Sequence, residues 1–264
     1  MIQQECNHPL YSQFDLNEKL AIISGTPFLL IKQSKTLVFG DLHFGQEYAI
    51  GLLDCDVSTE KSILAEYLLR TISDIRKTIT IDNLVLNGDI KHEIFGTNGQ
   101  EINSLQYFLN DSRVADLQIT LIKGNHDVLL RQSLRHIQHN NITICDNICE
   151  PPICIFHGHE DNSNTECEII ILSHEHPSFI FRGNNFEKVR IMAFVTLKSK
   201  TNTDIVILPP ANFISSGVIF PIKKNTDFFS PYLRENAVTE SQQIFPFSKE
   251  TGVLPLPPIN RSHS

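Results

Sequence analysis

Several residues with metal-binding side chains stand beside glycines along this chain of 264 residues. Each glycine comes at the end of a short apolar run, in the motifs Phe39-Gly40-Asp41-Leu42-His43, Asn87-Gly88-Asp89, Lys123-Gly124-Asn125-His126-Asp127 and Phe156-His157-Gly158-His159. A fifth apolar run leads to the pair His174 and His176. Glycine allows a sharp turn at a strand end, which presents the neighbouring polar residue at the rim of a sheet. We therefore expect several rims to converge on one point.

The donors in these motifs are two carboxylates, one carboxamide and four imidazoles, with no thiolate. This set is too large for one tetrahedral zinc ion and suits two adjacent divalent ions. The seven candidate ligands are Asp41, His43, Asp89, Asn125, His157, His174 and His176. We expect Asp89 to bridge the ions, because one carboxylate can bind both and its charge offsets their repulsion. One ion then takes Asp41, His43 and His176, and the other takes Asn125, His157 and His174.

One ligand position has two candidates, His157 and His159. We prefer His157 because it directly follows the expected strand 153–156, and we assign His159 to the substrate side. The remaining candidate substrate contacts flank proposed ligands and are His92, Lys91 and Lys123. A lysine on a loop is more often simply solvated, and a solvated loop is an equal alternative for His92.

The elements that must position these residues follow from the apolar pattern. Strands are expected at 28–32, 36–39, 83–86 and 118–122, and a helix at 58–77 has apolar residues at i, i+3 and i+4 behind a cap at Ser58. A weaker helix is expected at 101–109. The 48 residues from Asp41 to Asp89 and the 36 from Asp89 to Asn125 allow β-α-β units, which take about 30 residues. Parallel neighbours are therefore expected in the first half.

From residue 141 onward the expected strands are closely spaced, at 153–156, 169–172, 178–181, 190–197 and 204–208, without long helices between them. This spacing favours antiparallel pairing, as do the 17 residues between His157 and His174. We expect one domain at 1–220. The segment 221–264 contains six of the 13 prolines, so we expect a tail packed on the domain or trailing from it, docked through the aromatic-rich stretch 227–232.

Composition excludes several classes of protein. The hydrophobic fraction of 41% and the charged fraction of 20% are typical of globular chains, and no apolar run approaches the roughly 18 to 20 residues of a membrane helix. Residues 1–20 lack a basic segment followed by an apolar one, so we expect no secretory signal and a cytoplasmic protein without a membrane partner. Six cysteines are too few for a disulfide framework at this length, and we expect reduced thiols.

The order D-x-H, G-D, G-N-H-D, H and H-x-H from Asp41 to about Pro177 resembles the calcineurin-like metallophosphoesterases. Within that family the chain is most similar to the archaeal and bacterial branch related to ligase-associated DNA damage response endonucleases. The residues that carry this finer resemblance are Gly-Asp-Leu-His, Gly-Asp-Ile-Lys-His-Glu, His-Gly-His and His-Glu-His-Pro.

The resemblance implies an α/β fold, a two-sheet β sandwich flanked by α-helices, and two divalent ions, with manganese first and iron or zinc as alternatives. It also implies that a water bridging the metals attacks phosphorus, without a covalent phospho-enzyme. His126 would stabilise the transition state or protonate the leaving oxygen, with Asp127 orienting its ring. The chain departs from the family at Ser173, where glycine is usual. If that position requires a positive φ, serine costs about 1 kcal/mol and weakens the second metal site.

The function predicted from these residues is phosphodiester hydrolysis, by a nuclease or phosphodiesterase in nucleic-acid metabolism or DNA repair. The formal charge of −8 disfavours tight nonspecific binding to a phosphate backbone. Either the substrate is small or single-stranded, or a DNA-repair protein partner supplies the affinity for single-stranded or duplex DNA. The alternatives are a hydrolase of small phosphate esters or cyclic nucleotides and a non-catalytic metal-binding scaffold.

Overall fold

A computed structural model describes residues 11–51, 62–96, 98–135, 137, 141–162, 166–183, 187–215 and 217–257. The first half of the chain builds a seven-stranded sheet in the order β1 to β7. Its strands are β1 (Gln13–Asp15), β2 (Leu20–Ile23), β3 (Leu29–Ile31), β4 (Thr36–Gly40), β5 (Asn83–Asn87), β6 (Gln118–Ile122) and β7 (Ile142–Cys145). Strands β1 to β4 pair antiparallel and β4 to β7 pair parallel. The parallel neighbours predicted from the motif spacing are confirmed.

The second half forms an eight-stranded sheet in the order β15-β14-β12-β13-β10-β9-β8, with β11 paired to β12. Its strands are β8 (Asn147–Glu150), β9 (Ile153–Phe156), β10 (Ile169–Leu172), β11 (Ser178–Arg182), β12 (Lys188–Ser199), β13 (Asp204–Ile207), β14 (Ala237–Ser248) and β15 (Gly252–Val253). Strands β9, β10 and β13 are mutually parallel. The antiparallel pairing expected between His157 and His174 is therefore wrong, because the connection after β9 returns the chain to the end of the sheet where β9 begins.

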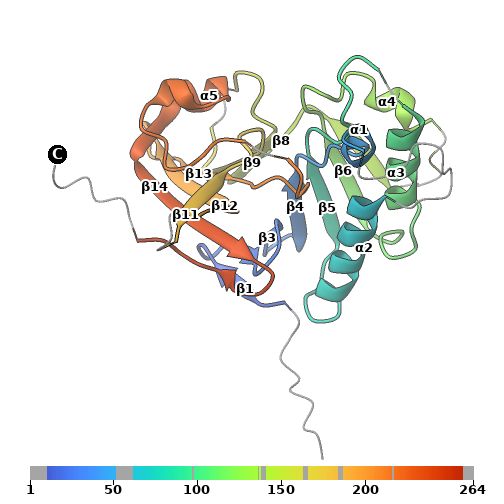
Figure 1. Ribbon diagram of the computed structural model, residues 1–264, viewed down its shortest axis with the longest axis horizontal. Coiled ribbons are helices and arrows are strands. Elements are labelled where there is room, and N and C mark those ends of the chain that lie inside the picture. The colour runs from blue at the N-terminus through green and yellow to red at the C-terminus, as the bar shows by residue number, and fades with distance from the viewer. Residues whose placement is uncertain are drawn as a thin grey trace, which may run out of the picture.

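The two sheets pack face to face, and helices cover their outer faces (Figure 1). On the first sheet lie α2 (Ile63–Ile75) and α3 (Gly99–Leu109), with the short helices α1 (Gln46–Ala49) and α4 (Leu130–Ser133) nearby. On the second sheet lies α5 (Pro231–Asn236), preceded by the 3-10 helix η1 (Asn225–Asp227). The expected two-sheet α/β sandwich flanked by helices is confirmed. No helix in the described ranges is long and apolar enough to cross a membrane.

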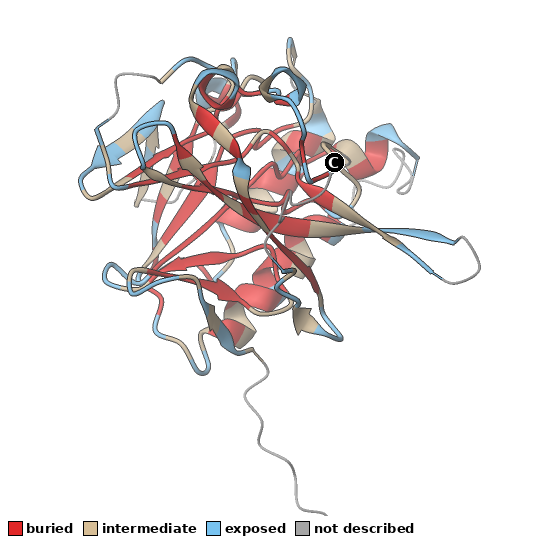
Figure 2. Cartoon of the chain, turned by 90° about the vertical axis from the view of Figure 1, so that its left-hand side faces the viewer, coloured by how far each residue is buried: buried red, intermediate tan, exposed pale blue. Residues whose placement is uncertain are grey.

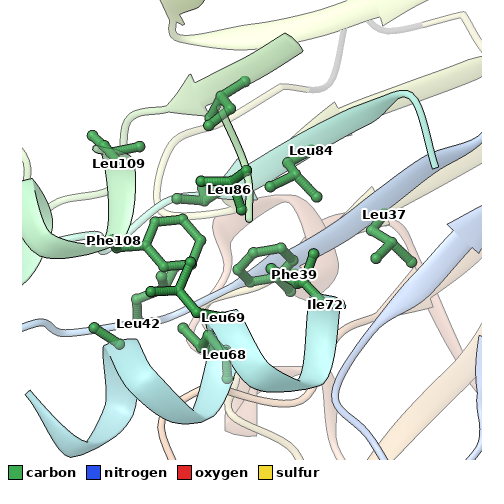
Figure 3. Packing of buried hydrophobic residues seen from close by; sticks show 14 of the residues in the cluster. Leu37, Phe39, Leu42, Leu68, Leu69, Ile72, Leu84, Leu86, Phe108 and Leu109 are labelled. Atoms are coloured by element: carbon green, nitrogen blue, oxygen red, sulfur yellow. The ribbon is translucent and has the colours of Figure 1, made fainter. Parts of the chain in front are cut away.

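Alternating side chains of the central strands fill two different layers of the core. In β4, Leu37 and Phe39 pack against Leu68 and Ile72 of α2, whereas Val38 lies between the sheets (Figure 3). This alternation follows from the two-residue period of a strand. Buried residues accordingly concentrate in the strands and on the inner sides of the helices (Figure 2). Helix α2 begins behind Ser62, whose hydroxyl accepts from the Ala65 amide; the expected cap Ser58 lies outside the described residues.

The segment after Phe220 differs from the expected tail. It supplies η1, α5, β14 and β15, and β14 pairs along β12 from Ala193↔Pro246 to Ser199↔Ala237. The expected boundary at residue 220 therefore does not separate two structural units. Two of the prolines that suggested irregular structure are compatible with regular elements. Pro231 occupies the first turn of α5, where a missing N–H is tolerated, and Pro246 lies within β14.

The structure also corrects the expectation of reduced thiols. Cys154 of β9 and Cys167, just before β10, form a disulfide with their Cα atoms 6.0 Å apart. Because β9 and β10 are parallel neighbours, the start of one strand lies beside the start of the other. Cys145 and Cys149 are free cysteines, while Cys6 and Cys55 lie outside the described residues.

Candidate metal centre

The candidate ligands follow strands that end at one edge of the sandwich. Asp41, Asp89 and Asn125 follow β4, β5 and β6 of the first sheet, and His157 and His174 follow β9 and β10 of the second. The two sheets are tied together at this edge. Gly40 forms a bridge with Pro210, and the Asn87 side chain donates to the Phe156 carbonyl at 3.1 Å. Parallel pairing therefore brings ligands from both sheets to one place.

Four of these side chains form a first cluster. The ligand atoms of Asp41, His43, Asp89 and His176 all lie within 4.8 Å of one another. His176 Nε2 is 3.2 Å from Asp41 Oδ1, and His43 Nε2 is 3.7 Å from Asp89 Oδ2. Asp41 and Asp89 are almost fully buried. Buried carboxylates next to imidazoles are suited to a divalent cation.

A second cluster shares one residue with the first. The ligand atoms of Asp89, His157 and His174 lie within 4.8 Å of one another, and His157 Nε2 is 3.3 Å from Asp89 Oδ1. Asn125 has a buried Oδ1 with no hydrogen-bond partner among the described residues. A carboxamide oxygen left unpaired in the interior is costly unless something coordinates it. Asp89 thus belongs to both clusters.

The orientation of His157 fits a metal ligand. Its Nδ1 lies 3.1 Å from the Asn87 carbonyl oxygen and can donate to it, which leaves Nε2, 3.3 Å from Asp89 Oδ1, as the nitrogen that faces the cluster. A metal ion bound there would displace the proton that Nε2 otherwise holds. Nε2 is buried and makes no hydrogen bond within the described part of the chain. A divalent ion at Nε2 would satisfy this atom. By this test the residues present fit a metal.

The backbone at the candidate ligands adopts an uncommon conformation. Seven described residues other than glycine have a positive φ, and five of them are the candidate ligands Asp41, His43, Asp89, His174 and His176. Each such residue costs roughly 1–3 kcal/mol and persists where its surroundings enforce it. Here the Asp41 amide donates to the Gly88 carbonyl at 3.0 Å, and the His43 amide donates to the Asp89 carbonyl at 2.8 Å. The loops are thus held in the shape that gathers the side chains.

Two glycines make room for this packing. Gly88 has a φ of +78°, and a Cβ built on it would overlap the His157 ring. A Cβ on Gly124 would overlap the carboxylate and the backbone of Asp89. Only glycine fits at these two positions, since His157 and Asp89 fill the space where a Cβ atom would stand.

Burial and charge act on the ligands in opposite directions. Burial would raise the pKa of Asp89 and of Asp41, but neighbouring imidazoles lower both pKa values below the usual range. Burial would lower the pKa of His157, but the carboxylates of Asp89 and Asp41 raise it to about 9. Burial lowers the pKa of His43 to about 3 and that of His174 to about 4. Both of these imidazoles are neutral at pH 7, as ligation requires.

His126 lies at the edge of the first cluster. Its ring centroid is 4.8 Å from that of His43, its Nε2 is 3.9 Å from Asp89 Oδ2, and its amide donates to Asp89 Oδ1 at 3.1 Å. The ring Nδ1 contacts the carbonyl oxygen of His92. His126 is therefore close to the ligands without belonging to either cluster.

Asp127 differs from its expected role. Its carboxylate accepts from the backbone amides of Gly124 at 2.8 Å, Ile90 at 3.0 Å and Lys91 at 3.2 Å. The carbonyl of His92, rather than Asp127, holds the ring of His126. Burial raises the pKa of Asp127 to about 6, against the effect of these amides. Asp127 joins the loop after β6 to the loop after β5.

The four candidate substrate contacts separate into two pairs. The ring of His92 lies 5.8 Å from that of His43, and the ring of His159 lies 5.3 Å from that of His157, so both histidines border the clusters. The Lys91 ammonium is buried and donates to the carbonyls of Glu93 and Gly96. Lys123 pairs with Asp146 at 2.5 Å. Both lysines are thus engaged by other groups. His159 belongs to neither cluster, whereas His157 does.

Ser173 does not impose the strain that we expected. Ser173 is not among the residues with a positive φ; the left-handed residue is its neighbour His174, with a φ of 71°. The Ser173 side chain is fully buried and lies where a Cβ on Gly40 would stand. The hydroxyl is accommodated because the residue opposite it is glycine.

Sequence reasoning missed two residues that hold the centre together. The side chain of Asn212 donates to the Leu42 carbonyl at 3.0 Å, and the backbone amide of Asn212 donates to the Asp41 carbonyl at 3.3 Å. Glu175, buried between the two histidine ligands, accepts from the amides of Phe229 at 3.1 Å and Ser230 at 2.7 Å. Burial raises the pKa of Glu175 to about 7, against these amides. Asn212 lies five residues after β13 ends, beyond Pro209 and Pro210, so a rule limited to the residues directly after a strand does not select it.

Comparisons with known proteins agree with this geometry. The sequence profile of the calcineurin-like phosphoesterase family matches residues 34–219. The crystal structure of Pseudomonas putida nuclease MPE is similar at a TM-score of 0.61 and 17% identity, over 93% of this chain and 100% of that chain. A search of curated proteins found no match. Because the family profile spans more than half of the chain, the protein belongs to the calcineurin-like phosphoesterase family and is a phosphoric ester hydrolase.

Proposed function

We propose that the protein hydrolyses phosphodiester bonds with two divalent cations bound at its two clusters. The observation that carries this proposal is that Asp89 belongs to both clusters. Two ions held side by side neutralise the phosphoryl oxygens and activate a water molecule. The proposed binuclear arrangement gives one ion Asp41, His43, His176 and Asp89, and gives the other Asp89, Asn125, His157 and His174.

The ligand chemistry leads us to propose manganese first, with iron or zinc as alternatives. Carboxylate, carboxamide and imidazole donors suit these ions, and no thiolate stands in either described cluster to favour a softer one. Buried carboxylates supply negative charge to offset the charge of the ions.

His126 is proposed to act on the leaving group. Because its Nδ1 faces the His92 carbonyl, Nε2 is the nitrogen left for the substrate. A proton held at Nε2 can pass to the leaving oxygen or stabilise charge on the transferred group. Asp127 acts indirectly in this proposal, by fixing the loop that carries His126 and Asn125.

The proposed substrate is a nucleic acid, with a role in DNA repair and an affinity-supplying protein partner. Two points support it: the motif resemblance to ligase-associated endonucleases, and the fold shared with a protein described as a nuclease. The cytoplasmic location stays a prediction from the sequence. A hydrolase of small phosphate esters is the second candidate, favoured by the formal charge of −8. A metal-binding scaffold without activity is the third.

The test measures metal content and hydrolysis together. Protein purified with manganese is analysed for metal per chain and assayed on bis(4-nitrophenyl) phosphate and 4-nitrophenyl phosphate, then on labelled single-stranded and duplex DNA. We expect about two ions per chain and a preference for the diester. Activity on the monoester alone would contradict the diesterase proposal, and a metal-loaded protein inactive on every ester would favour the scaffold.

A further inference from the structure

A cavity of about 460 Å³ opens beside His176 of the first cluster. Its walls include residues from distant parts of the chain, among them Tyr67 of α2, Arg190 of β12, Phe213 after β13 and Lys249 after β14. The volume lies in the range of pockets that hold small ligands. A group in this cavity would be a direct neighbour of a phosphate held at the first cluster.

The charge of this cavity is opposite to that of the chain. Arg190 and Lys249 line it, together with His176, and none of its described lining residues is Asp or Glu. Other cavities of the molecule do contain carboxylates: Glu150 in one, Asp204 in a second, and Glu66 with Asp74 in a third. In a chain with eight excess negative charges, a cationic cavity beside the metal centre suits an anionic ligand.

Arg190 is held in place with a donor to spare. Its Nε donates to Ser178 Oγ at 2.7 Å, and its Nη2 donates to the Gly217 carbonyl. Gly217 packs on His176 so closely that a Cβ there would overlap it. The hydrogen bonds of Arg190 to described residues leave Nη1 unused, and no described carboxylate pairs with it. A guanidinium fixed in this way is prepared to bind a phosphate oxygen.

Phe213 gives the cavity an aromatic surface. Its residue exposure is 47%, and Tyr67 meets its ring edge-on, with the ring centroids 6.3 Å apart and an interplanar angle of 83°. The edge contact supports the phenylalanine from one side. An aromatic ring open to solvent in a cavity that cations also line is the arrangement that binds unpaired nucleobases, because the base stacks while the phosphates meet the cations.

We propose that this cavity binds one unpaired nucleotide next to the scissile phosphate, with its base on Phe213 and its phosphate at Arg190 and Lys249. The inference rests on the proposed phosphodiesterase function and specifies its substrate. A base inside a duplex is already stacked on both faces and cannot also stack on Phe213, so internal duplex regions are excluded from the site. The adjoining cavity shares Tyr67 and Lys249, but its other cation, Arg70, is paired with Glu66 and Asp74 adds a further carboxylate, so that cavity has no excess of positive charge for a second phosphate. The site thus fits a single nucleotide at a strand end or in a single strand.

The test compares two chromogenic diesters that share a leaving group. These are the 4-nitrophenyl ester of thymidine 5′-phosphate and methyl 4-nitrophenyl phosphate, assayed with manganese-loaded protein. We expect the wild-type chain to prefer the thymidine ester, and Phe213→Ala to reduce the ratio of the two kcat/KM values about tenfold, the magnitude of one lost stacking contact. Phe95→Ala is the matched control, since Phe95 is 92% exposed and does not line the cavity; its ratio should equal that of the wild type.

A binding measurement gives a second result without turnover of a diester. Isothermal titration calorimetry with thymidine 5′-monophosphate and with inorganic phosphate should show a preference for the nucleotide that Phe213→Ala removes. Hydrolysis of neither diester by the wild-type chain would overturn the proposed function. Hydrolysis of both with equal kcat/KM, an equal loss in Phe95→Ala, or equal cleavage of blunt duplex and single-stranded DNA would overturn the nucleotide site alone.

Discussion

The two sheets bring different chemistry to the edge where they meet. The first sheet provides all the oxygen donors, Asp41, Asp89 and Asn125, with one imidazole from His43. The second sheet provides only imidazoles, and its candidate ligands are His157, His174 and His176. Neither sheet alone contains a complete set for either ion. The proposed centre therefore exists only when the two sheets are packed together. Metal binding and the packing of the sheets should then stabilise each other.

The largest effect is expected at the residue that serves both clusters. Asp89→Asn should lower kcat on a phosphodiester by a thousandfold or more, on the order of the loss seen when a metal site fails. Metal per chain should fall as well. Asp82→Asn is the control, because Asp82 pairs with Lys35 on the surface. Retention of full activity and metal by Asp89→Asn would show that the two clusters do not depend on a shared carboxylate.

Adjacent ligands of the second sheet should affect different ions. His174→Ala and His176→Ala lie on one loop but belong to different clusters. Each should reduce bound metal from about two ions per chain to about one, since each leaves the other set intact. Elemental analysis measures the number of ions, and two ions retained in both variants would argue against the assignment of histidines to separate sites.

Removal of metal should loosen the contact between the sheets. A ligand at a hundred times its Kd stabilises the folded state by about 2.7 kcal/mol, which corresponds to roughly 5–10 °C in Tm for a chain of this size. Treatment with EDTA should lower Tm by about this amount in the wild-type chain and by much less in Asp89→Asn. Differential scanning calorimetry provides the measurement, and an equal shift in both proteins would place the stabilising metal elsewhere.

Only one sheet has a covalent link among the described residues, and this difference can be tested separately. The disulfide Cys154–Cys167 closes a loop of 13 residues in the second sheet. The double variant Cys154→Ala, Cys167→Ala should lose about 2–3 kcal/mol of unfolding free energy, as expected for a loop of this length. Urea unfolding measures the loss, and Cys145→Ala serves as the single-thiol control. An unchanged free energy of unfolding would mean that the second sheet needs no link.

The smallest effect is expected in the helices that cover the first sheet. Glu66 of α2 accepts from Arg113 at 2.8 Å and from the Tyr107 hydroxyl at 2.7 Å. The bond from Arg113 has the largest effect on the pKa of Glu66, and together the two bonds lower that pKa although burial would raise it. A lowered folded pKa contributes stability above the unfolded value of about 4.5, and that stability is lost as the pH falls below it. Because the pair is near the surface, Glu66→Gln should cost no more than about 1 kcal/mol at pH 7. The difference between the two proteins should shrink in unfolding curves below pH 4.

The candidate ligands could be picked out in the sequence because each lies at or just after a strand end. A buried strand is a short apolar run, and the glycine or polar residue after it is visible in the printed chain. The strands before Asp41, Asp89 and Asn125 could therefore be predicted together with these residues. The spacing between the three residues correctly predicted that those strands are parallel neighbours. The partners of side chains were less accessible. The contacts of Asp127 with the amides of Ile90 and Lys91 join loops that are far apart in the chain.

The second sheet was harder to predict for physical reasons. The parallel strands β9 and β10 are separated by only 12 residues, 157–168, so the spacing resembled that of a hairpin. Strand β14 begins 30 residues after β13 ends and contains Pro246, so no local pattern revealed its partner β12. The disulfide depends on the same non-local pairing, because only a parallel register brings Cys167 near Cys154.

The late position of β14 has a consequence for biosynthesis. A ribosome delivers the first sheet early, but β12 lacks a neighbour along one side until residues 237–248 have emerged. The nascent chain therefore carries an open strand edge through the synthesis of about 40 residues, and such edges invite pairing with other chains. A chain cut before residue 237 would keep every histidine and carboxylate of the centre and still lack the strand that closes this edge.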